Sequence, residues 1–383
     1  MLQSYESNGH VRGTDTQNCD VILCSMPDNA SVEAAVASPT SSVGSGRSRN
    51  PVFVVGCHRS GTNLLYDTLL SAGGFALYRG SLPIYKVVIP RCGPLHVAAN
   101  RAKAIDLFLC SKGFRRTGLE SAEVSSKLEA ECRTGGDFIR IVMEEIASKQ
   151  GVPRWAVYDP DYVLHVERIK RDLPNALFLH IVRDGRDIAL SLMKMGGFRP
   201  FPWSSKARGL LETAVYWEWM VRKGQHYGRM FPDSYLEVHY EELVNEPKKT
   251  LAAVSQFIDQ DLDYDHVQQA ALGRLKESNS SFLGEPELGR QNPVNRWKER
   301  LSHDEVVAIE SLVSGCLEDL GYPLTTTTVE RKLGQRGKLM RALYPCFLDA
   351  KLWIKIKTPV GRFSDISVLQ LSDRAEGQAE NHR

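Results

Sequence analysis

Two apolar stretches in this chain have the length and continuity of buried β-strands. They span residues 52–55 and 177–182, and a third strand is expected over 235–240. Uninterrupted apolar runs are typical of strands that are buried on both faces of a parallel sheet. Helical spacing of apolar residues follows each stretch, at Leu64, Leu65 and Leu69, at Ile188, Leu192 and Met193, and at Leu251, Val254, Phe257 and Ile258. This succession predicts an α/β fold around a mostly parallel sheet.

The rest of the chain divides by composition. Residues 1–50 are polar and rich in serine, so we expect a disordered leader. Residues 84–152 include apolar positions at helical spacing and no comparable strand pattern, which predicts a helical insertion into a domain spanning 51–324. A last helix of that domain is expected over 306–320.

A C-terminal extension, residues 325–383, has a pattern of its own. Between residues 325 and 362 it carries nine Lys and Arg against Glu330 and Asp349, and large apolar residues are interleaved with them. A basic amphipathic segment of this kind is compatible with peripheral contact to an anionic membrane surface. The alternative is an extension that packs on the domain, and the sequence leaves both open.

Composition narrows the class of protein. The chain has 383 residues, 42% of them hydrophobic, and a net charge of +2, which fits one large domain with tails and gives no reason to expect a nucleic-acid partner. Eight cysteines form no paired framework, and no apolar run reaches the length of a transmembrane helix. The first residues lack the pattern of a signal peptide. We therefore expect a cytoplasmic protein, with membrane contact at most peripheral; the oligomeric state stays open.

The segment after the first strand predicts an anion-binding loop. Gly56 and Gly61 allow a tight turn, and a helix is expected to open near Thr62 with its free N–H groups facing the loop. Arg59 adds a permanent positive charge, and Ser60, Thr62 and Asn63 add neutral donors. A nucleoside-triphosphate P-loop has the same glycine spacing, but Thr62 and Asn63 stand where it requires Lys and Ser/Thr. The alternative without a ligand is an ordinary strand–turn–helix.

A second anion site is predicted after the strand at 177–182. Arg183 follows that strand, and Ser191 lies about two turns along a helix that we expect Asp187 to cap. Ligands of open α/β sheets bind at the carboxyl ends of the strands, where Arg183 is placed. Together the two segments indicate a ligand with two separated anionic groups.

The sequence resembles the sulfotransferases that use 3′-phosphoadenosine 5′-phosphosulfate (PAPS), in particular the bacterial and tyrosylprotein branch. The likeness runs over residues 51–324 and rests on the loop 59–63, on Arg183 with Ser191, and on the segments 155–176, 240–251 and 296–323. It implies a P-loop-like three-layer fold and a reaction without a metal ion. It also implies that Arg59, Ser60, Gly61, Thr62 and Asn63 bind the 5′-phosphosulfate, and that Arg183 and Ser191 bind the 3′-phosphate.

Further residues come from the family's later blocks. By resemblance, Arg296 and Lys298 close over the nucleotide beside Trp297, which either stacks on the adenine or packs in the core. Tyr240 either lines the nucleotide or ends a strand as a core residue.

Two departures from the family leave the acceptor chemistry open. No carboxylate stands about twenty residues after Arg59, where members commonly carry a catalytic Glu, and Tyr158 replaces the Lys that often precedes the Asp159-Pro160 pair. Our candidates for the base are Glu120, Glu123 and His96, whereas His58 is expected to be non-catalytic.

The family resemblance implies sulfuryl transfer to a hydroxyl, less readily an amine. The acceptor is expected to be a carbohydrate, a lipid or another small molecule, bound between the insertion and the donor site. The alternatives are a PAPS-binding protein with impaired catalysis and, less in keeping with the loop, a P-loop kinase.

Overall fold

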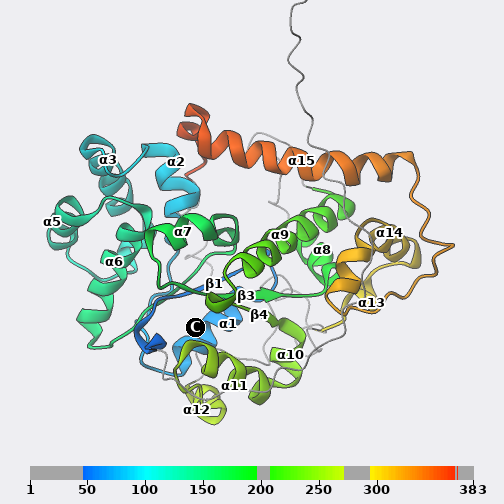
Figure 1. The fold of residues 1–383 in the computed structure, drawn as a ribbon, viewed down its shortest axis with the longest axis horizontal. Coiled ribbons are helices and arrows are strands. Elements are labelled where there is room, and N and C mark those ends of the chain that lie inside the picture. Colours follow the sequence, from blue (N-terminus) through cyan, green and yellow to red (C-terminus); the bar gives the residue numbers. More distant parts are fainter. Residues whose placement is uncertain (1–45, 196–207, 271–293, 367–368, 370–383) are drawn as a thin grey trace, which may run out of the picture. The chain divides into compact units, whose positions relative to one another are not determined.

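Four parallel strands form the central sheet, in the order β2-β1-β3-β4 (Figure 1). They are β1 (Val52–Gly56), β2 (Ala156–Tyr158), β3 (Leu177–Val182) and β4 (Tyr235–His239). The computed structural model describes residues 46–195, 208–270, 294–366 and 369. The three predicted strands are confirmed, although β4 ends one residue early because Tyr240 opens the next helix. The short strand β2 was not predicted.

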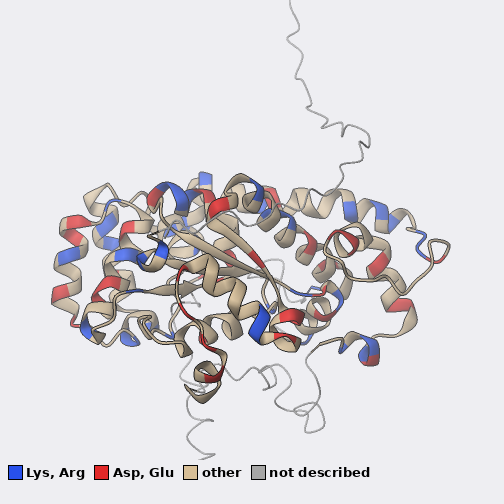
Figure 2. Ribbon diagram, turned by 60° about the horizontal axis from the view of Figure 1, so that its bottom comes forward, with Lys and Arg blue, Asp and Glu red and all other residues tan. Residues whose placement is uncertain are grey.

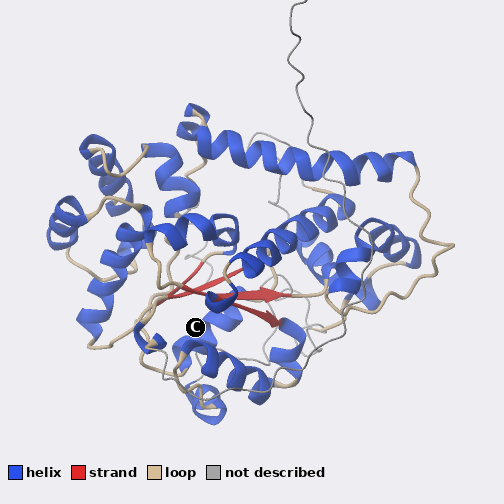
Figure 3. Ribbon diagram, in the orientation of Figure 1, coloured by secondary structure: helices blue, strands red, loops and turns tan. Residues whose placement is uncertain are grey.

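Helices cover both faces of the sheet, and this explains the uninterrupted apolar strands (Figure 3). On one face lie α1 (Thr62–Ser71), α10 (Tyr240–Asn245), α11 (Pro247–Ile258) and α12 (Tyr264–Ala270). The other face packs against α6 (Gly135–Gln150), α7 (Val166–Asp172), α8 (Gly185–Lys194), α9 (Leu210–Met230) and α14 (His303–Asp319). Successive β1 residues, Val52 and Phe53, enter opposite clusters. The predicted three-layer α/β fold with a parallel sheet is confirmed.

The segment between α1 and β2 is helical. It contains a π-helix (Ile84–Val88), α2 (Ile89–Cys92), α3 (Ala98–Leu109), α4 (Lys112–Arg115), α5 (Ser121–Glu131) and α6. A reciprocal capping box between Thr134 and Asp137 begins α6. Apolar residues from α3, α5 and α6 join the same cluster as β1 and β3, so the segment shares the core of the domain.

The C-terminal extension forms a long helix, α15 (Gln335–Lys357; Figure 1), and a 3₁₀ turn over Pro359–Phe363. Basic and acidic residues are both spread over the helices of the domain (Figure 2). Trp219 Nε1 of α9 donates to Asp349 Oδ1 at 3.0 Å, and Leu348 is buried, so α15 packs on α9. Beyond the helix, Arg91 of α2 donates to the carbonyls of Arg362 and Ser364 at 3.1 and 2.9 Å. The extension therefore runs over the domain and reaches α2.

The expected leader, residues 1–50, lies outside the described residues except for 46–50. Within 46–50, Arg47 Nη1 donates to the carbonyl of Phe257, and Arg154 Nη2 donates to the carbonyl of Arg47. A short 3₁₀ turn, Arg47–Arg49, thus belongs to the folded domain. Within the described ranges, no helix combines the length and the apolar character needed to cross a bilayer.

Candidate functional site

The loop between β1 and α1 is held in a conformation that depends on glycine. Gly61, the N-cap of α1, has φ +104°, and a Cβ there would lie 2.4 Å from the Tyr240 ring. A Cβ on Gly56 would lie 2.4 Å from the carbonyl oxygen of Ile181. Arg59 itself has φ +74°, which is rare for a residue with a side chain. The backbone is therefore shaped to present the Arg59 side chain and the first turn of α1.

The neutral loop residues divide into two roles. Ser60 is fully buried, and both its N–H and its hydroxyl are directed to the carbonyl of Cys57, at 3.1 and 2.7 Å. Ser60 thus holds the turn together. Thr62 and Asn63 form the first turn of α1, where backbone N–H groups have no partner within the helix. Those groups are suited to a bound anion.

The two predicted anion-binding segments meet, because β1 and β3 are neighbours in the sheet. Arg59 Nε donates to Ser191 Oγ at 3.1 Å. Arg183 Nη1 donates to the carbonyl of Arg59 at 3.4 Å. These two pairs of residues, which are separated by 132 and 124 positions in the sequence, are thereby in direct contact.

Arg183 is almost completely buried, and its surroundings keep it charged. Its guanidinium lies 4.4 Å from the centroid of the Tyr240 ring and 3.4 Å from Asp187 Oδ2. Burial lowers the pKa of Arg183, but the opposite effect of Asp187 and Tyr240 is larger, so the pKa lies above its ordinary value. Tyr240 is the first residue of α10 and only 6% exposed, so it forms the support under Arg183 and Gly61.

The prediction that Asp187 caps the helix is wrong. Asp184 is the N-cap of α8 and accepts from the N–H of Arg186 at 2.9 Å. Asp187 instead accepts from the N–H groups of Asn295 and Trp297, at 3.1 and 2.9 Å, besides pairing with Arg183. It therefore ties α8 to the segment that carries Arg296.

Arg296 brings a third guanidinium to the same place. It is 3% exposed, and its pKa is lowered first by burial and then by Arg183. The pKa of Arg59 is lowered by the same two causes. Three buried or half-buried cations that repel one another form a site that an anion would stabilise.

Trp297 packs rather than presenting a face for stacking. It is 3% exposed, the Arg186 guanidinium lies 3.9 Å from its ring centroid, and the Lys298 ammonium lies 5.6 Å from it. Arg186 is held in turn by Asp184 and by Glu310, at 2.7 and 2.6 Å. Lys298 itself is exposed.

A second polar cluster lies beside Arg59 and was not predicted. His58 Nε2 is 3.3 Å from Asp161 Oδ2, and Lys86 of the π-helix forms an ion pair with the same carboxylate. Burial alone would raise the pKa of Asp161, but Lys86 and His58 hold it well below its usual range. The pKa of Asp159 is raised, chiefly by burial, with Lys86 opposing the shift and Asp161 adding to it. The Asp159-Pro160-Asp161 motif marked this place in the sequence, but Lys86 carried no such signal.

The three candidate bases lie elsewhere. Glu120 precedes α5, His96 precedes α3, and Glu123 pairs with Lys127 at 3.7 Å; all three are exposed. In Figure 1, α3 and α5 lie at the outer edge of the insertion, away from the carboxyl ends of the strands. The structure does not bring these residues to Arg59.

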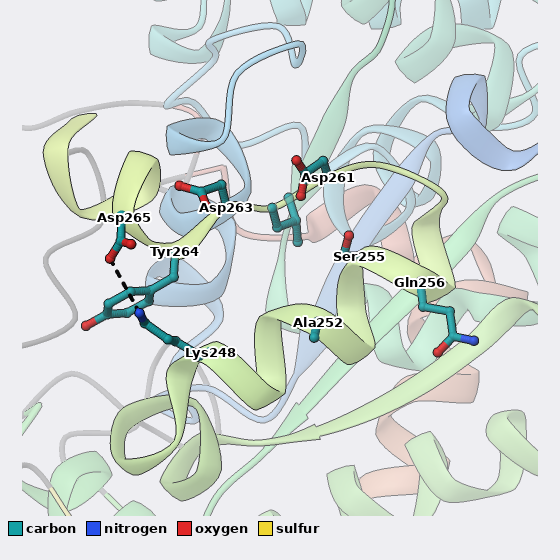
Figure 4. A pocket seen from close by; sticks show the side chains of 9 residues that line it. Lys248, Ala252, Ser255, Gln256, Asp261, Asp263, Tyr264 and Asp265 are labelled. Carbon is teal, nitrogen blue, oxygen red and sulfur yellow. Dashed lines mark ion pairs between the residues drawn. The ribbon is translucent and has the colours of Figure 1, made fainter.

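A pocket lies between α11 and α12, away from these clusters (Figure 4). It contains Lys248, which pairs with Asp265 at 3.7 Å and lies over the Tyr264 ring. None of the arginines described above lines it, and its charged groups face water. Across the described ranges, no group of three or more His, Cys, Asp or Glu residues is placed to hold a metal ion.

The model of the "Sulfotransferase family" matches residues 51–264, more than half of the chain. The chain belongs to the sulfotransferase family. It is a PAPS-dependent sulfotransferase, as the sequence resemblance implied.

Individual relatives are distant. A "Putative protein-tyrosine sulfotransferase" of Caenorhabditis briggsae is 23% identical over 201 residues, 50% of this chain and 69% of the relative. Its counterpart from Caenorhabditis elegans is 26% identical over 126 residues, 32% of this chain and 47% of the relative. The chain thus spans about half the length of the second.

Solved structures resemble the chain at low identity. The sulfotransferase domain of the Synechococcus PCC 7002 olefin synthase has a TM-score of 0.46 at 18% identity, covering 67% of this chain and 90% of the domain. Mouse sulfotransferase SULT7A1, complexed with PAP, has a TM-score of 0.36 at 14% identity, covering 81% of this chain and 92% of that protein.

Proposed function

We propose that the sulfotransferase binds PAPS across the three arginines and transfers its sulfuryl group to an acceptor hydroxyl. The observation that carries the donor site is the convergence of Arg59, Arg183 and Arg296 from three segments, with Ser191 on Arg59. Arg59 and the first turn of α1 would bind the phosphosulfate, and Arg183 with Ser191 and Arg296 would bind the 3′-phosphate. Charge-assisted contacts to planar guanidinium groups suit both anions.

We assign His58 as the group that accepts the acceptor's proton, against the expectation from the sequence. His58 directly precedes Arg59, and Asp161 lies at its Nε2. Because Asp161 stays ionised, it favours the tautomer with the proton on Nε2 and the lone pair on Nδ1. A carboxylate that orients an imidazole is a common arrangement for general-base catalysis.

Transfer of the sulfuryl group requires no reactant besides PAPS and the acceptor. The acceptor oxygen bonds to sulfur, the bond between sulfur and the bridging phosphate oxygen breaks, and the hydroxyl proton passes to His58 Nδ1. Adenosine 3′,5′-bisphosphate leaves with the bonding electrons. As in phosphoryl transfer, positioning and neutralisation of charge would carry most of the catalysis, with Arg59 stabilising the leaving oxygen as it gains charge.

Two classes of hydroxyl are candidates for the acceptor. The first is the hydroxyl of a carbohydrate, lipid or other small molecule. The second is the hydroxyl of a peptide tyrosine, which the names of the two nematode relatives favour.

His58→Gln tests the base. Glutamine retains a side-chain amide near Asp161 but cannot take up the proton, so we expect turnover with labelled PAPS to fall by about 10²–10⁴-fold. Binding of adenosine 3′,5′-bisphosphate, measured by calorimetry, should stay unchanged. The exposed His303→Gln serves as the matched control. Full turnover of His58→Gln would place the base elsewhere. Wild-type protein that binds the bisphosphate but sulfates no phenol, sugar or lipid alcohol would support the alternative of impaired catalysis.

A further inference from the structure

One face of α15 is turned toward the domain and carries two lysines. Tyr344, Leu348, Lys351 and Lys355 recur at intervals of four, three and four residues, which places them on one side of the helix. Leu348 is 4% exposed, and the Tyr344 hydroxyl accepts a hydrogen bond from Arg208 Nε at 2.7 Å. Trp353, which is 60% exposed, lies on the opposite side. The two lysines are therefore directed inward together with buried residues.

The lysines enter a region that already contains other cations. The pKa of Lys351 is lowered to about 8, chiefly by burial and then by Arg208 and Lys355. The pKa of Lys355 is lowered by burial and then by Lys86, with Asp161 opposing the shift. Among the described residues, no carboxylate lies within ion-pair distance of the Lys355 ammonium.

This region is continuous with the catalytic cluster. Asp161 contacts both His58 and Lys86, and its charge acts on Lys351 and Lys355. Burial of Tyr216 raises its pKa, with contributions from Asp161 and Cys57, and the Arg208 guanidinium lies 5.3 Å from its ring centroid. Tyr216 is thus within electrostatic range of Asp161, and Arg208 joins Tyr216 to Tyr344 of α15.

The balance of charge in this region favours an anion. Arg208 and Lys355 act on Lys351, and Lys86 acts on Lys355; among the described residues, Asp159, Asp161 and Asp365 oppose these effects. Half-burying several cations side by side costs free energy, which a bound acid group would offset. The helix that supplies two of these cations lies outside residues 51–264.

We propose that the acceptor is an acid, and that Lys351 and Lys355 of α15 bind its carboxylate, sulfate or phosphate group while its hydroxyl lies at His58. This inference rests on the proposed function. It makes the C-terminal extension a wall of the acceptor site and Lys355 a residue that determines specificity.

Matched phenols test the inference by binding as well as by turnover. The full-length protein is saturated with adenosine 3′,5′-bisphosphate and titrated with 4-hydroxyphenylacetate, 4-hydroxyphenyl phosphate or the uncharged 4-hydroxyphenylacetamide; the same compounds are then offered as acceptors with labelled PAPS. We expect the acids to bind about tenfold or more tightly than the amide, as one charge-assisted contact predicts. Lys355→Gln should remove most of this preference and leave the affinity for the amide unchanged.

Two variants and one prior measurement sharpen the result. Lys355→Glu should shift the preference toward the cationic 4-hydroxyphenethylamine, whereas the exposed Lys357→Gln should change nothing. Equal binding of the acids and the amide by wild-type protein overturns the inference, as does an equal loss for all phenols in Lys355→Gln. Affinity for the bisphosphate is measured first without any phenol, so a failure of the donor site is distinguished from a failure of acid recognition.

Discussion

The substitution Arg183→Met examines how the enzyme selects a 3′-phosphorylated nucleotide. Methionine keeps an apolar side chain against the Tyr240 ring, on which the Arg183 guanidinium lies at 4.4 Å, but it removes the charge. If Arg183 binds the 3′-phosphate, the variant should lose affinity for adenosine 3′,5′-bisphosphate and keep its affinity for adenosine 5′-phosphate, which lacks that group.

The expected magnitude follows from the contacts of Arg183. A hydrogen bond to a charged partner contributes about 1.5–3 kcal/mol, so losing one corresponds to about a 10- to 150-fold weaker complex. The substitution also leaves Asp187 buried without its partner cation, and breaking a buried pair costs about 3–5 kcal/mol of stability. The double variant Arg183→Met/Asp187→Asn removes that second penalty, because it removes the stranded charge.

Calorimetry with the two nucleotides separates these effects. Arg154→Met is the matched control, since Arg154 is also buried but donates to the carbonyls of Asn50, Ile258 and Arg47. It should lower stability without changing the ratio of the two affinities. A ratio unchanged in both the single and the double Arg183 variant would refute the assignment of the 3′-phosphate to Arg183.

Two further predictions concern stability. Glu310→Gln should lower the free energy of unfolding by about 3–5 kcal/mol in denaturant titrations, because the fully buried Glu310 pairs with Arg186 at 2.6 Å and accepts hydrogen bonds from Thr325 and Thr326. The exposed Asp304→Asn is the control and should have no such effect. Equal unfolding midpoints for Glu310→Gln and the wild-type protein would count against a structural ion pair. Burial lowers the pKa of His165 to about 3, so the ring stays neutral in the folded state while the unfolded state takes up a proton below about pH 6.5. Its contribution is therefore complete above pH 6.5 and declines by up to about 1.4 kcal/mol per unit as the pH falls toward 3, and His165→Phe should flatten the measured pH–stability curve by that amount.

The features that could be predicted from the sequence are those that depend on local apolar pattern and on the order of the strands. The apolar runs at 52–55 and 177–182 could be assigned because both faces of the sheet are covered, and parallel strands end at one edge. The two anion-binding segments could be placed at the same edge for that reason, but the direct hydrogen bond between Arg59 and Ser191 was not predicted. Capping was misassigned because Asp184 and Asp187 have the same chemistry, and only the position of the Asn295 segment distinguishes them.

The acceptor side could not be predicted because its residues share no motif. Lys86 meets Asp161 through a π-helix whose packing is set by the insertion. Lys355 reaches the same region from nearly 300 residues after Arg59. Neither position follows from spacing along the chain. Glu120 and His96 have side chains suited to a general base, but they do not lie near Arg59.

The packing of α15 has a consequence for how such enzymes diverge. The loop at Arg59 and its arginine partner Arg183 lie within residues 51–264, while Lys351 and Lys355 lie in α15, which packs on α9 outside that range. On the proposed role of Lys351 and Lys355, substitutions in that helix would alter which molecule is sulfated without disturbing the source of the sulfate. Two relatives with the same core would then act on different compounds, and exchanging their C-terminal helices would exchange their substrates.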